Sequence, residues 1–359
     1  MGRRTALVAA LVAAVAAIAL VAWAVRRGGE PLGKFEVRPG CPAPATRPPP
    51  RDRRGSDLVA VTSRERQTIT GWGASVVSDT FIDPLVDTGG LSPGQLRELD
   101  RLVFAEAGID IVRVFGPGFG RARVSAPARD RVRDRSFAFM RRIAANGVRF
   151  MYTGADAPPA LKDGRRLRTE GERPLARYVA GYLRFAREVV GVGFDYAAIA
   201  NEPDNRSSRL TMTPEQSARV YAALAGELDR QGMATRLVLG DTTGWGTACP
   251  YVSAQLARGR ARSRAVAVAS HPYYGSGDEA RAVAEQARRA GVEVWQTEYG
   301  TGCATCSEDD SIHRAIGWSR KIVSDLTKAQ VSAWFAFRAV ADSTHGPGDA
   351  LLVRVRRDR

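Results

Sequence analysis

The chain has 359 residues, of which 44% are hydrophobic and 25% are charged, a composition typical of a globular protein and not of a disordered or fibrous one. The formal net charge is +15, and +7 of it lies before Gly55, where ten basic residues accompany three acidic ones. The remaining basic residues are scattered among acids, without a stripe of basic and aromatic side chains. We therefore exclude a dedicated nucleic-acid-binding protein and expect no nucleic-acid partner.

The first 27 residues are typical of a targeting segment. Residues 5–25 form an uncharged apolar run with a pair of arginines on each side. A helix that spans a bilayer needs about 20 apolar residues, whereas the apolar region of a signal peptide needs only about 7–15. We expect residues 1–27 to be an uncleaved signal anchor, with a cleaved signal peptide as the alternative. Both predict a catalytic domain outside the cytoplasm, held at the cell membrane or secreted.

Residues 28–56 contain several prolines, including the run Pro48-Pro49-Pro50, followed by arginines. Proline prefers extended backbone and cannot donate a backbone hydrogen bond, so this segment predicts a semi-rigid linker.

The chain has four cysteines: Cys41, Cys249, Cys303 and Cys306. In an exported protein these residues can oxidise, and four cysteines allow three pairings. We expect structural disulfide bonds. Free thiols, or a metal or redox site at the Cys303–Cys306 pair, remain alternatives.

From residue 65 onward, short β-rich runs alternate with amphipathic ones. The predicted strands are residues 68–75, 109–115, 148–153, 196–201, 236–241, 265–271, 292–298 and 331–337. The clearest predicted helices are residues 92–107, 174–190, 213–230 and 311–328.

Repeated strand–helix alternation indicates a parallel sheet, and eight units of this size match a (β/α)8 TIM barrel. We assign the barrel to residues 57–345 and a short basic tail to residues 346–359. A doubly wound open sheet is the alternative, but the segment after the first predicted strand lacks the glycine-rich phosphate-binding pattern of that fold.

Polar residues gather at the ends of the predicted strands. Glu202 and Glu298 each follow an apolar run, at the ends of the fourth and seventh strands. In such barrels the carboxyl ends of the strands meet at one mouth, where catalytic residues lie. Two carboxyl groups that face each other there are what hydrolysis of a glycosidic bond requires. A structural ion pair is the alternative for these two residues.

Five motifs share the order and placement of one enzyme family. They are Thr70-Gly71-Trp72-Gly73-Ala74-Ser75, Ala157-Pro158-Pro159-Ala160-Leu161-Lys162, Asn201-Glu202-Pro203, His271-Pro272-Tyr273 and Trp295-Gln296-Thr297-Glu298-Tyr299-Gly300. Together they resemble the retaining (β/α)8-barrel glycosidases, most closely glycoside hydrolase family 30. Family members usually carry a C-terminal β-sandwich beside the barrel, whereas here the sequence ends at Arg359, so we expect a barrel without it.

The resemblance implies roles for individual residues. Glu202 would be the general acid/base, Glu298 the nucleophile, and Asn201 a donor to the sugar 2-hydroxyl. The other candidates for binding the substrate are Arg113, beside the nucleophile, and His271, Tyr273, Trp334, Asp156, Asp79 and Trp72. The alternative for Arg113 is an ion pair in the barrel core, and for His271 a structural role. For Asp156 the alternative is a cap on the following turn, and for Trp72 a place in the core.

These observations predict a retaining O-glycosyl hydrolase that cleaves a β-linked polysaccharide or oligosaccharide by a two-glutamate mechanism. No metal or organic cofactor is expected, because two carboxyl groups can perform the proton transfers and the covalent step. Membrane contact is expected only through residues 5–25. The alternative function is a non-catalytic carbohydrate-binding or scaffold protein on a degenerate barrel.

Overall fold

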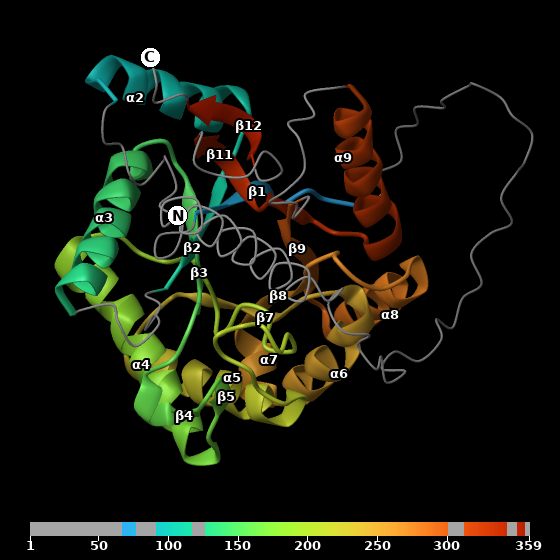
Figure 1. The fold of residues 1–359 in the computed structure, drawn as a ribbon. Helices are drawn as coiled ribbons and strands as arrows, with labels where there is room; N and C mark the ends of the chain where they lie inside the picture. The colour runs from blue at the N-terminus through green and yellow to red at the C-terminus, as the bar shows by residue number, and fades with distance from the viewer. Residues whose placement is uncertain (1–66, 77–90, 117–125, 301–311, 343–349, 356–359) are drawn as a thin grey trace, which may run out of the picture. The chain divides into compact units, whose positions relative to one another are not determined.

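The computed structural model describes residues 67–76, 91–116, 126–300, 312–342 and 350–355. Eight parallel strands close into a barrel in the order β1-β2-β3-β6-β7-β8-β9-β10 (Figure 1). Their bounds are β1 Gly71–Val76, β2 Ile111–Phe115, β3 Arg149–Thr153, β6 Tyr196–Ala198, β7 Arg236–Thr242, β8 Ala265–Ser270, β9 Glu293–Tyr299 and β10 Ala333–Ala336. Each of the eight predicted strands overlaps one of these, so the predicted (β/α)8 barrel is confirmed.

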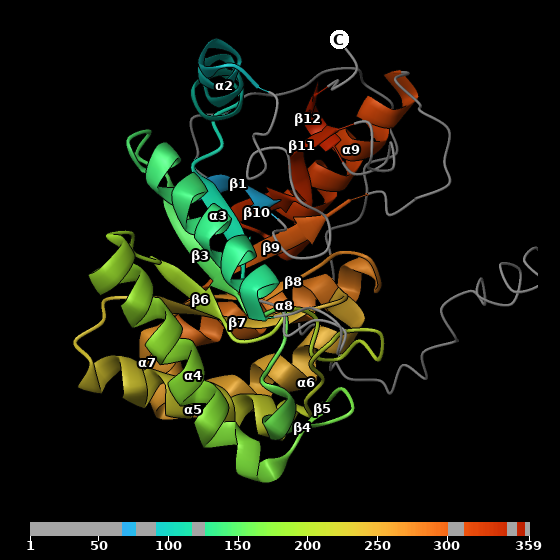
Figure 2. The same cartoon turned by 60° about the vertical axis from the view of Figure 1, so that its left-hand side comes forward.

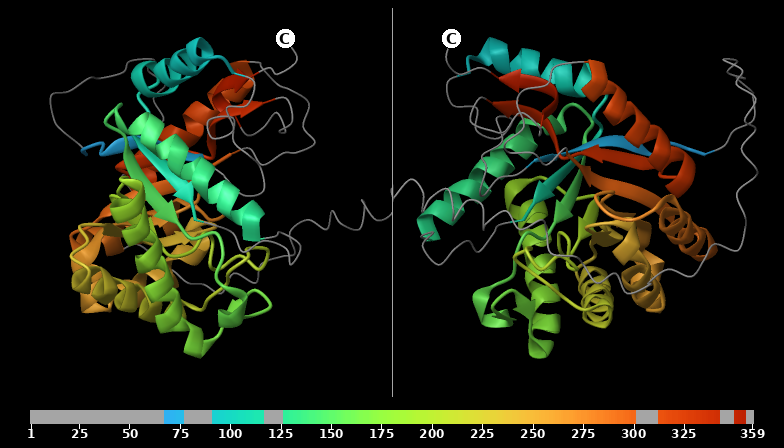
Figure 3. Two further views of the ribbon diagram at one scale, coloured as in Figure 1. Left: turned by 90° about the vertical axis from the view of Figure 1, so that its left-hand side faces the viewer. Right: turned by 45° about the vertical axis from the view of Figure 1, so that its right-hand side comes forward.

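Helices cover the outside of the barrel, as the rotated views show (Figures 2 and 3). They are α2 Pro93–Asp100, α3 Ala126–Ala144, α4 Glu172–Phe185, α5 Pro214–Arg230, α6 Trp245–Leu256, α7 Gly259–Arg264, α8 Gly277–Ala290 and α9 Ile312–Ser324. Three of the four predicted helices continue into a π-helical turn, at η1 Arg101–Glu106, η4 Ala186–Val190 and η5 Asp325–Ala329. All four are confirmed.

Local sequence explains where several helices begin. Ser92, Thr213 and Ser276 each cap a helix by accepting a hydrogen bond from the backbone of the third helical residue, whose side chain bonds back to the cap. Such reciprocal bonds satisfy amide groups that a helix N-terminus otherwise leaves unpaired.

The core has two layers because side chains alternate along each strand. Ile111, Met151, Tyr196, Trp295 and Phe335 belong to the cluster that fills the barrel interior. A larger cluster lies between the strands and the helices. Gly73 makes this interior packing possible, since a Cβ atom there would lie 2.2 Å from the Phe335 ring.

Shorter elements follow some strands. β4 Lys162–Asp163 and β5 Arg166–Leu167 form a hairpin between β3 and α4, flanked by the 3-10 turns η2 Pro159–Leu161 and η3 Thr169–Gly171. After the barrel, β11 Arg338–Asp342 pairs in parallel with β12 Ala350–Val355. Within the predicted basic tail, residues Ala350–Val355 therefore form a strand.

Several sequence predictions concern residues outside the described ranges. These are the anchor or signal peptide at residues 1–27, the linker at residues 28–56, Asp79, and three of the four cysteines. The fourth, Cys249, is buried in α6, and no described cysteine is free. The disulfide pairing thus stays a prediction. Among the described helices, none has the length and apolar character needed to cross a bilayer.

Two glycine substitutions test the packing of the barrel. A Cβ atom on Gly154, just after β3, would lie 1.9 Å from the carbonyl oxygen of Ile199, whereas Gly181 in α4 has open space around it. We expect Gly154→Ala to lower the free energy of unfolding by at least about 1–3 kcal/mol, as overpacking does. Gly181→Ala should raise it by roughly 0.5–1 kcal/mol. Denaturant titrations of both variants measure these changes, and equal stabilities would contradict the strand register described here.

Candidate active site

Arg113 lies at the centre of the barrel mouth and is completely buried. A guanidinium group has five N–H donors, and here each has an acceptor. Nε donates to Thr153 at 3.0 Å, and the two terminal nitrogens donate to carboxylate, amide and hydroxyl oxygens. These acceptors are Glu298 Oε2 at 2.8 Å, Ser75 Oγ at 3.3 Å, Asn201 Oδ1 at 2.6 Å and Asp241 Oδ2 at 2.9 Å. One side chain thereby links residues from five strands or their ends.

The carboxylates around Arg113 keep it charged. Burial acts to lower the pKa of Arg113, but the negative charges of Asp241 and Glu298 outweigh it and raise that pKa above its ordinary value. The same pairing acts on the acid. Burial alone would raise the pKa of Asp241, yet Arg113 and His271 hold it below the ordinary range. A buried charge of either sign is tolerated here only because of its partners.

Glu202 follows β6 at a break in regular strand structure. Its φ angle is 50°, in the left-handed region that residues other than glycine seldom adopt. Its backbone N–H donates to the carbonyl oxygen of Asp241 at 2.8 Å, which stabilises this conformation. Its Oε2 accepts a hydrogen bond from Asn205 at 2.7 Å. The loop after β6 therefore both turns Glu202 into the mouth and fixes its carboxylate.

Asp241 belongs to the same cluster, although the sequence did not reveal its contacts. It ends an apolar run, but nothing in that run indicates its partners. Between Gly240 and Thr242, β7 advances by two residues while β8 advances by one, so Asp241 is the extra residue of a bulge, with φ 57°. Bulges re-aim side chains near active sites. This one directs a fully buried carboxylate to Arg113 and to Thr297, which donates at 2.6 Å.

A second bulge places Glu298. From Trp334 to Ala336, β10 advances by two residues. The paired stretch of β9, from Gln296 to Tyr299, advances by three, so β9 has one extra residue before Tyr299. At this break the side-chain oxygen of Gln296 accepts the hydrogen bond of the Phe335 backbone N–H at 2.9 Å. Thr297 and Glu298, although adjacent, can therefore both bond to groups at the barrel mouth.

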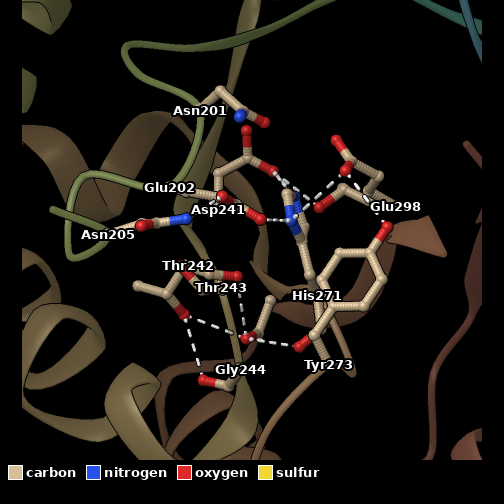
Figure 4. Close-up of polar contacts among 12 residues, drawn as sticks. Asn201, Glu202, Asn205, Asp241, Thr242, Thr243, Gly244, His271, Tyr273 and Glu298 are labelled. Carbon is tan, nitrogen blue, oxygen red and sulfur yellow. Dashed lines mark hydrogen bonds and ion pairs between the residues drawn. The ribbon is translucent and has the colours of Figure 1, made fainter. Parts of the chain in front are cut away.

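His271 and Tyr273, which follow β8, connect the two glutamates. Figure 4 shows His271 between Glu202 and Glu298. Its Nδ1 lies 2.8 Å from Glu202 Oε1 and 4.0 Å from Glu298 Oε1, and its Nε2 lies 3.4 Å from Asp241 Oδ1. The Tyr273 hydroxyl donates to Glu298 Oε1 at 3.2 Å. Burial and the nearby glutamates raise the pKa of Tyr273, so this hydroxyl keeps its proton.

The histidine is held in its charged form. Burial acts to lower the pKa of His271, but Glu298, Asp241 and Glu202 outweigh it and raise the pKa to about 10. The converse applies to the acid it contacts. Burial raises the pKa of Glu202, but the hydrogen bond and charge of His271 reverse this and bring the pKa below its ordinary value. In the resting site, the proton between the two residues is on the imidazole.

Three ligand atoms, one each from Glu202, His271 and Glu298, lie within 4.8 Å of one another. Geometry alone would admit a cation at this point. However, a histidine must be neutral to bind a metal, and the raised pKa of His271 opposes that state. The 4.8 Å limit also means that a carboxylate oxygen of Glu202 lies close to a carboxylate oxygen of Glu298.

Two predicted sugar-binding residues are corrected by the structure. Trp334 is 2% exposed and faces the helices, with its indole N–H donating to Asp325 at 3.1 Å. It cannot face inward because its neighbour Phe335 does. Trp72 lies near the amino end of β1, level with Asp110, and is 37% exposed outside the core. Neither side chain reaches the mouth.

Asp156, after β3, makes structural contacts, but it does not cap the following turn Pro159–Leu161, whose N-cap is Pro158. Its Oδ1 accepts a hydrogen bond from the backbone N–H of Ala157 at 2.8 Å and forms an ion pair with Lys162. Only 5% of the residue is exposed. Asp79, the remaining candidate, lies outside the described residues. The other five residues, Arg113, Asn201, Glu202, His271 and Tyr273, meet Glu298 in one cluster as predicted.

A hollow of about 660 Å³ lies at the opposite end of the barrel, where strands β3, β6 and β7 begin. Phe150, Phe194, Tyr196, Met233 and Arg236 are among the residues that line it. Barrel enzymes place their chemistry at the carboxyl ends of the strands, so we assign the active site to the Arg113 cluster and not to this hollow.

Paired glutamates at the carboxyl end of a barrel are the arrangement that hydrolysis of a glycosidic bond requires. Residues 184–354 match the family model of the glycosyl hydrolase catalytic core. The matched residues are slightly less than half of the chain. A search of curated proteins gave no significant match.

Solved structures show the same fold. One is the family 30 endoxylanase from Clostridium papyrosolvens C71, with a TM-score of 0.58 and 18% identity over 75% of this chain and 65% of that one. Another is family 30 xylanase C from Talaromyces cellulolyticus, with a TM-score of 0.58 and 19% identity over 78% and 70%. An endo-β-1,6-glucanase gives a TM-score of 0.65 and 15% identity over 84% and 75%.

This chain thus spans slightly less than two thirds of the length of the Clostridium enzyme. The comparisons confirm the resemblance to family 30 predicted from the sequence, at the level of the barrel fold and the catalytic core.

Removing the central cation should destabilise the protein in a pH-dependent way. Arg113→Met leaves the Asp241 and Glu298 carboxylates buried with only His271, among the described residues, as a nearby cation, which we expect to cost about 3–5 kcal/mol at pH 7. Without Arg113, we expect burial to outweigh His271 and raise the pKa of Asp241 above its unfolded value, so the variant gains stability as protonation begins. The difference from wild type should therefore shrink as the pH falls from 7 towards about 4. Denaturant unfolding across this range measures it, and a difference independent of pH would contradict the charge assignment.

Proposed function

We propose that the chain is a retaining glycoside hydrolase that cleaves a β-linked glycan by double displacement. One observation supports this most directly: oxygens of Glu202 and Glu298 lie within 4.8 Å of each other. Retaining enzymes hold their two carboxyl groups about 5–5.5 Å apart, whereas inverting enzymes need about 6.5–9.5 Å to admit a water molecule between them.

In this mechanism Glu298 is the nucleophile. Arg113 and Tyr273 each donate to one of its two oxygens, which orients the carboxylate. Attack on the anomeric carbon forms a glycosyl ester with Glu298 while the bond to the leaving oxygen breaks. As negative charge leaves the carboxylate, both donors remain in place for the return step.

Glu202 is the general acid/base. It protonates the leaving oxygen in the first step and takes a proton from water in the second. Asn201, whose Oδ1 is held by Arg113, presents its amide N–H2 group as the donor to the sugar 2-hydroxyl. Such a bond strengthens in the oxocarbenium-like transition state.

The substrate class comes from analogy and charge. The related solved structures include two xylanases and an endo-β-1,6-glucanase. We propose a polysaccharide or oligosaccharide with β linkages, with xylan, β-1,6-glucan, β-1,6-galactan and galactofuranan as candidates. The net charge of +15 favours anionic envelope polymers through long-range attraction. Residues 1–27 support an exported protein tethered to a membrane.

The nucleophile assignment predicts a specific loss of activity. Glu298→Gln keeps the size and much of the hydrogen bonding but cannot form the ester, so turnover should fall by several orders of magnitude with the fold intact. Glu285→Gln, a change at a partly exposed residue on α8, is the control and should retain full activity. Reducing-sugar release from a panel of β-glycans, with circular dichroism on each sample, measures both. A Glu298→Gln variant that retained activity would contradict the assignment.

The retaining mechanism predicts chemical rescue. In Glu202→Ala the ester on Glu298 can still form from a substrate with a good leaving group, but no base activates water. Azide needs no base, so it should restore turnover and yield a glycosyl azide of β configuration. NMR of the product gives the anomer, and an α-azide would indicate inversion.

A sugar-binding protein without activity is the competing outcome of these assays. It predicts binding of a glycan by wild type and Glu298→Gln alike, with no release of reducing sugar by either. The complete set of donors and acceptors around Glu298 supports catalysis instead.

A further inference from the structure

The lowered pKa of Glu202 favours the negatively charged carboxylate, which does not suit its proposed role as a general acid. A general acid must hold a proton when the leaving group departs, yet the contact with His271 favours the Glu202 carboxylate in the resting site. The nearest proton donor is the His271 ring, whose Nδ1 lies 2.8 Å from Glu202 Oε1 and whose raised pKa favours the protonated form. The question is what holds the proton there.

Asp241 is the group in position to do so. It is completely buried and lies 3.4 Å from Nε2 of His271, on the far side of the ring from Glu202. The other groups around the ring differ from Asp241 in charge, distance or the ring atom that they face. Arg113 faces Nε2 at 3.5 Å and opposes a positive ring, Glu298 lies 4.0 Å from Nδ1, and the Tyr273 ring meets the imidazole edge-on.

We propose that Asp241 is a positioning residue that keeps both ring nitrogens of His271 protonated, so that His271 stores the proton which Glu202 delivers to the leaving group. The inference rests on the proposed glycosidase function, because it explains how Glu202 becomes an acid there. Asp241 itself touches neither the sugar nor the reacting atoms. Its fixed place in the β7 bulge, held by Arg113 and Thr297, keeps its carboxylate beside the ring.

The proton balance is simple. The N–H bond at Nδ1 breaks as an O–H bond forms on Glu202, leaving a neutral imidazole and a neutral carboxylic acid. Glu202 then gives this proton to the glycosidic oxygen while Glu298 forms the ester and the C–O bond breaks. In the second step water attacks the anomeric carbon, the ester bond breaks, and the proton of the water returns through Glu202 to Nδ1.

The direct test is the titration of His271 itself. The chain has only three histidines, so ring NMR signals of the full-length protein labelled at histidine can be assigned with His271→Gln. In the wild type, His271 should remain protonated to about pH 9, since its pKa is about 10. In Asp241→Asn, the amide N–H2 group can face Nε2 as a donor and favours the neutral ring. The titration midpoint should then fall, while the charges of Glu298 and Glu202 keep it above the ordinary histidine value.

The control is Thr297→Val, which removes a hydrogen bond to Asp241 but keeps its charge, and should leave His271 protonated above pH 8. A wild-type His271 that titrates near 6.5, or an unchanged midpoint in Asp241→Asn, would overturn the proposal. Should Asp241→Asn not fold, a wild-type His271 that titrates near 6.5 still overturns the proposal. Because this readout needs no substrate, it is independent of whether the glycosidase function is correct.

Kinetics give the second readout once a substrate is known. Asp241→Asn should shift the alkaline limb of the kcat/KM profile to lower pH by as much as it shifts the His271 midpoint. A merely structural role would lower the plateau and leave both limbs in place, which would overturn the proposal.

Discussion

The active site depends on one constraint: a completely buried arginine must have an acceptor for every donor and enough negative charge to remain ionised. Arg113 meets it with oxygens from five neighbouring elements, two of them carboxylates. Because these partners cannot move without leaving a buried charge unpaired, Glu298, Asn201 and Asp241 are held in one arrangement before any substrate arrives. Such preorganisation is what a glycosidase site requires.

The acids reach this arrangement through irregular backbone. Glu202 follows β6 with a positive φ, Asp241 is the extra residue of a bulge in β7, and Glu298 lies within a bulge of β9. Regular strands would direct alternate residues to opposite faces and could not present Thr297 and Glu298 to the same cluster. The hydrogen bond from the Glu202 backbone to Asp241 further links two of these strained positions. Strain at such sites is maintained by the surrounding contacts.

Strand order and the principal acids could be predicted from the sequence because apolar runs and the residues ending them are local features. Glu202 and Glu298 were found in this way. The direction of a side chain was harder to predict. Trp334 lies in a correctly predicted strand, but its face is set by the inward packing of Phe335 against Gly73, a contact between distant segments. The role of Asp241 depends on a bulge that nothing in the local sequence indicates.

The most direct test of the central claim is to trap the covalent intermediate. The full-length protein would be incubated with 2-deoxy-2-fluoro-β-glycosyl fluorides of xylo, gluco and galacto configuration, then digested and analysed by mass spectrometry. We expect one sugar to label the peptide that contains Glu298 with one equivalent, and no labelling of Glu298→Gln. A label on another residue, or hydrolysis of a matching glycan with inversion at the anomeric carbon, would contradict the double-displacement account.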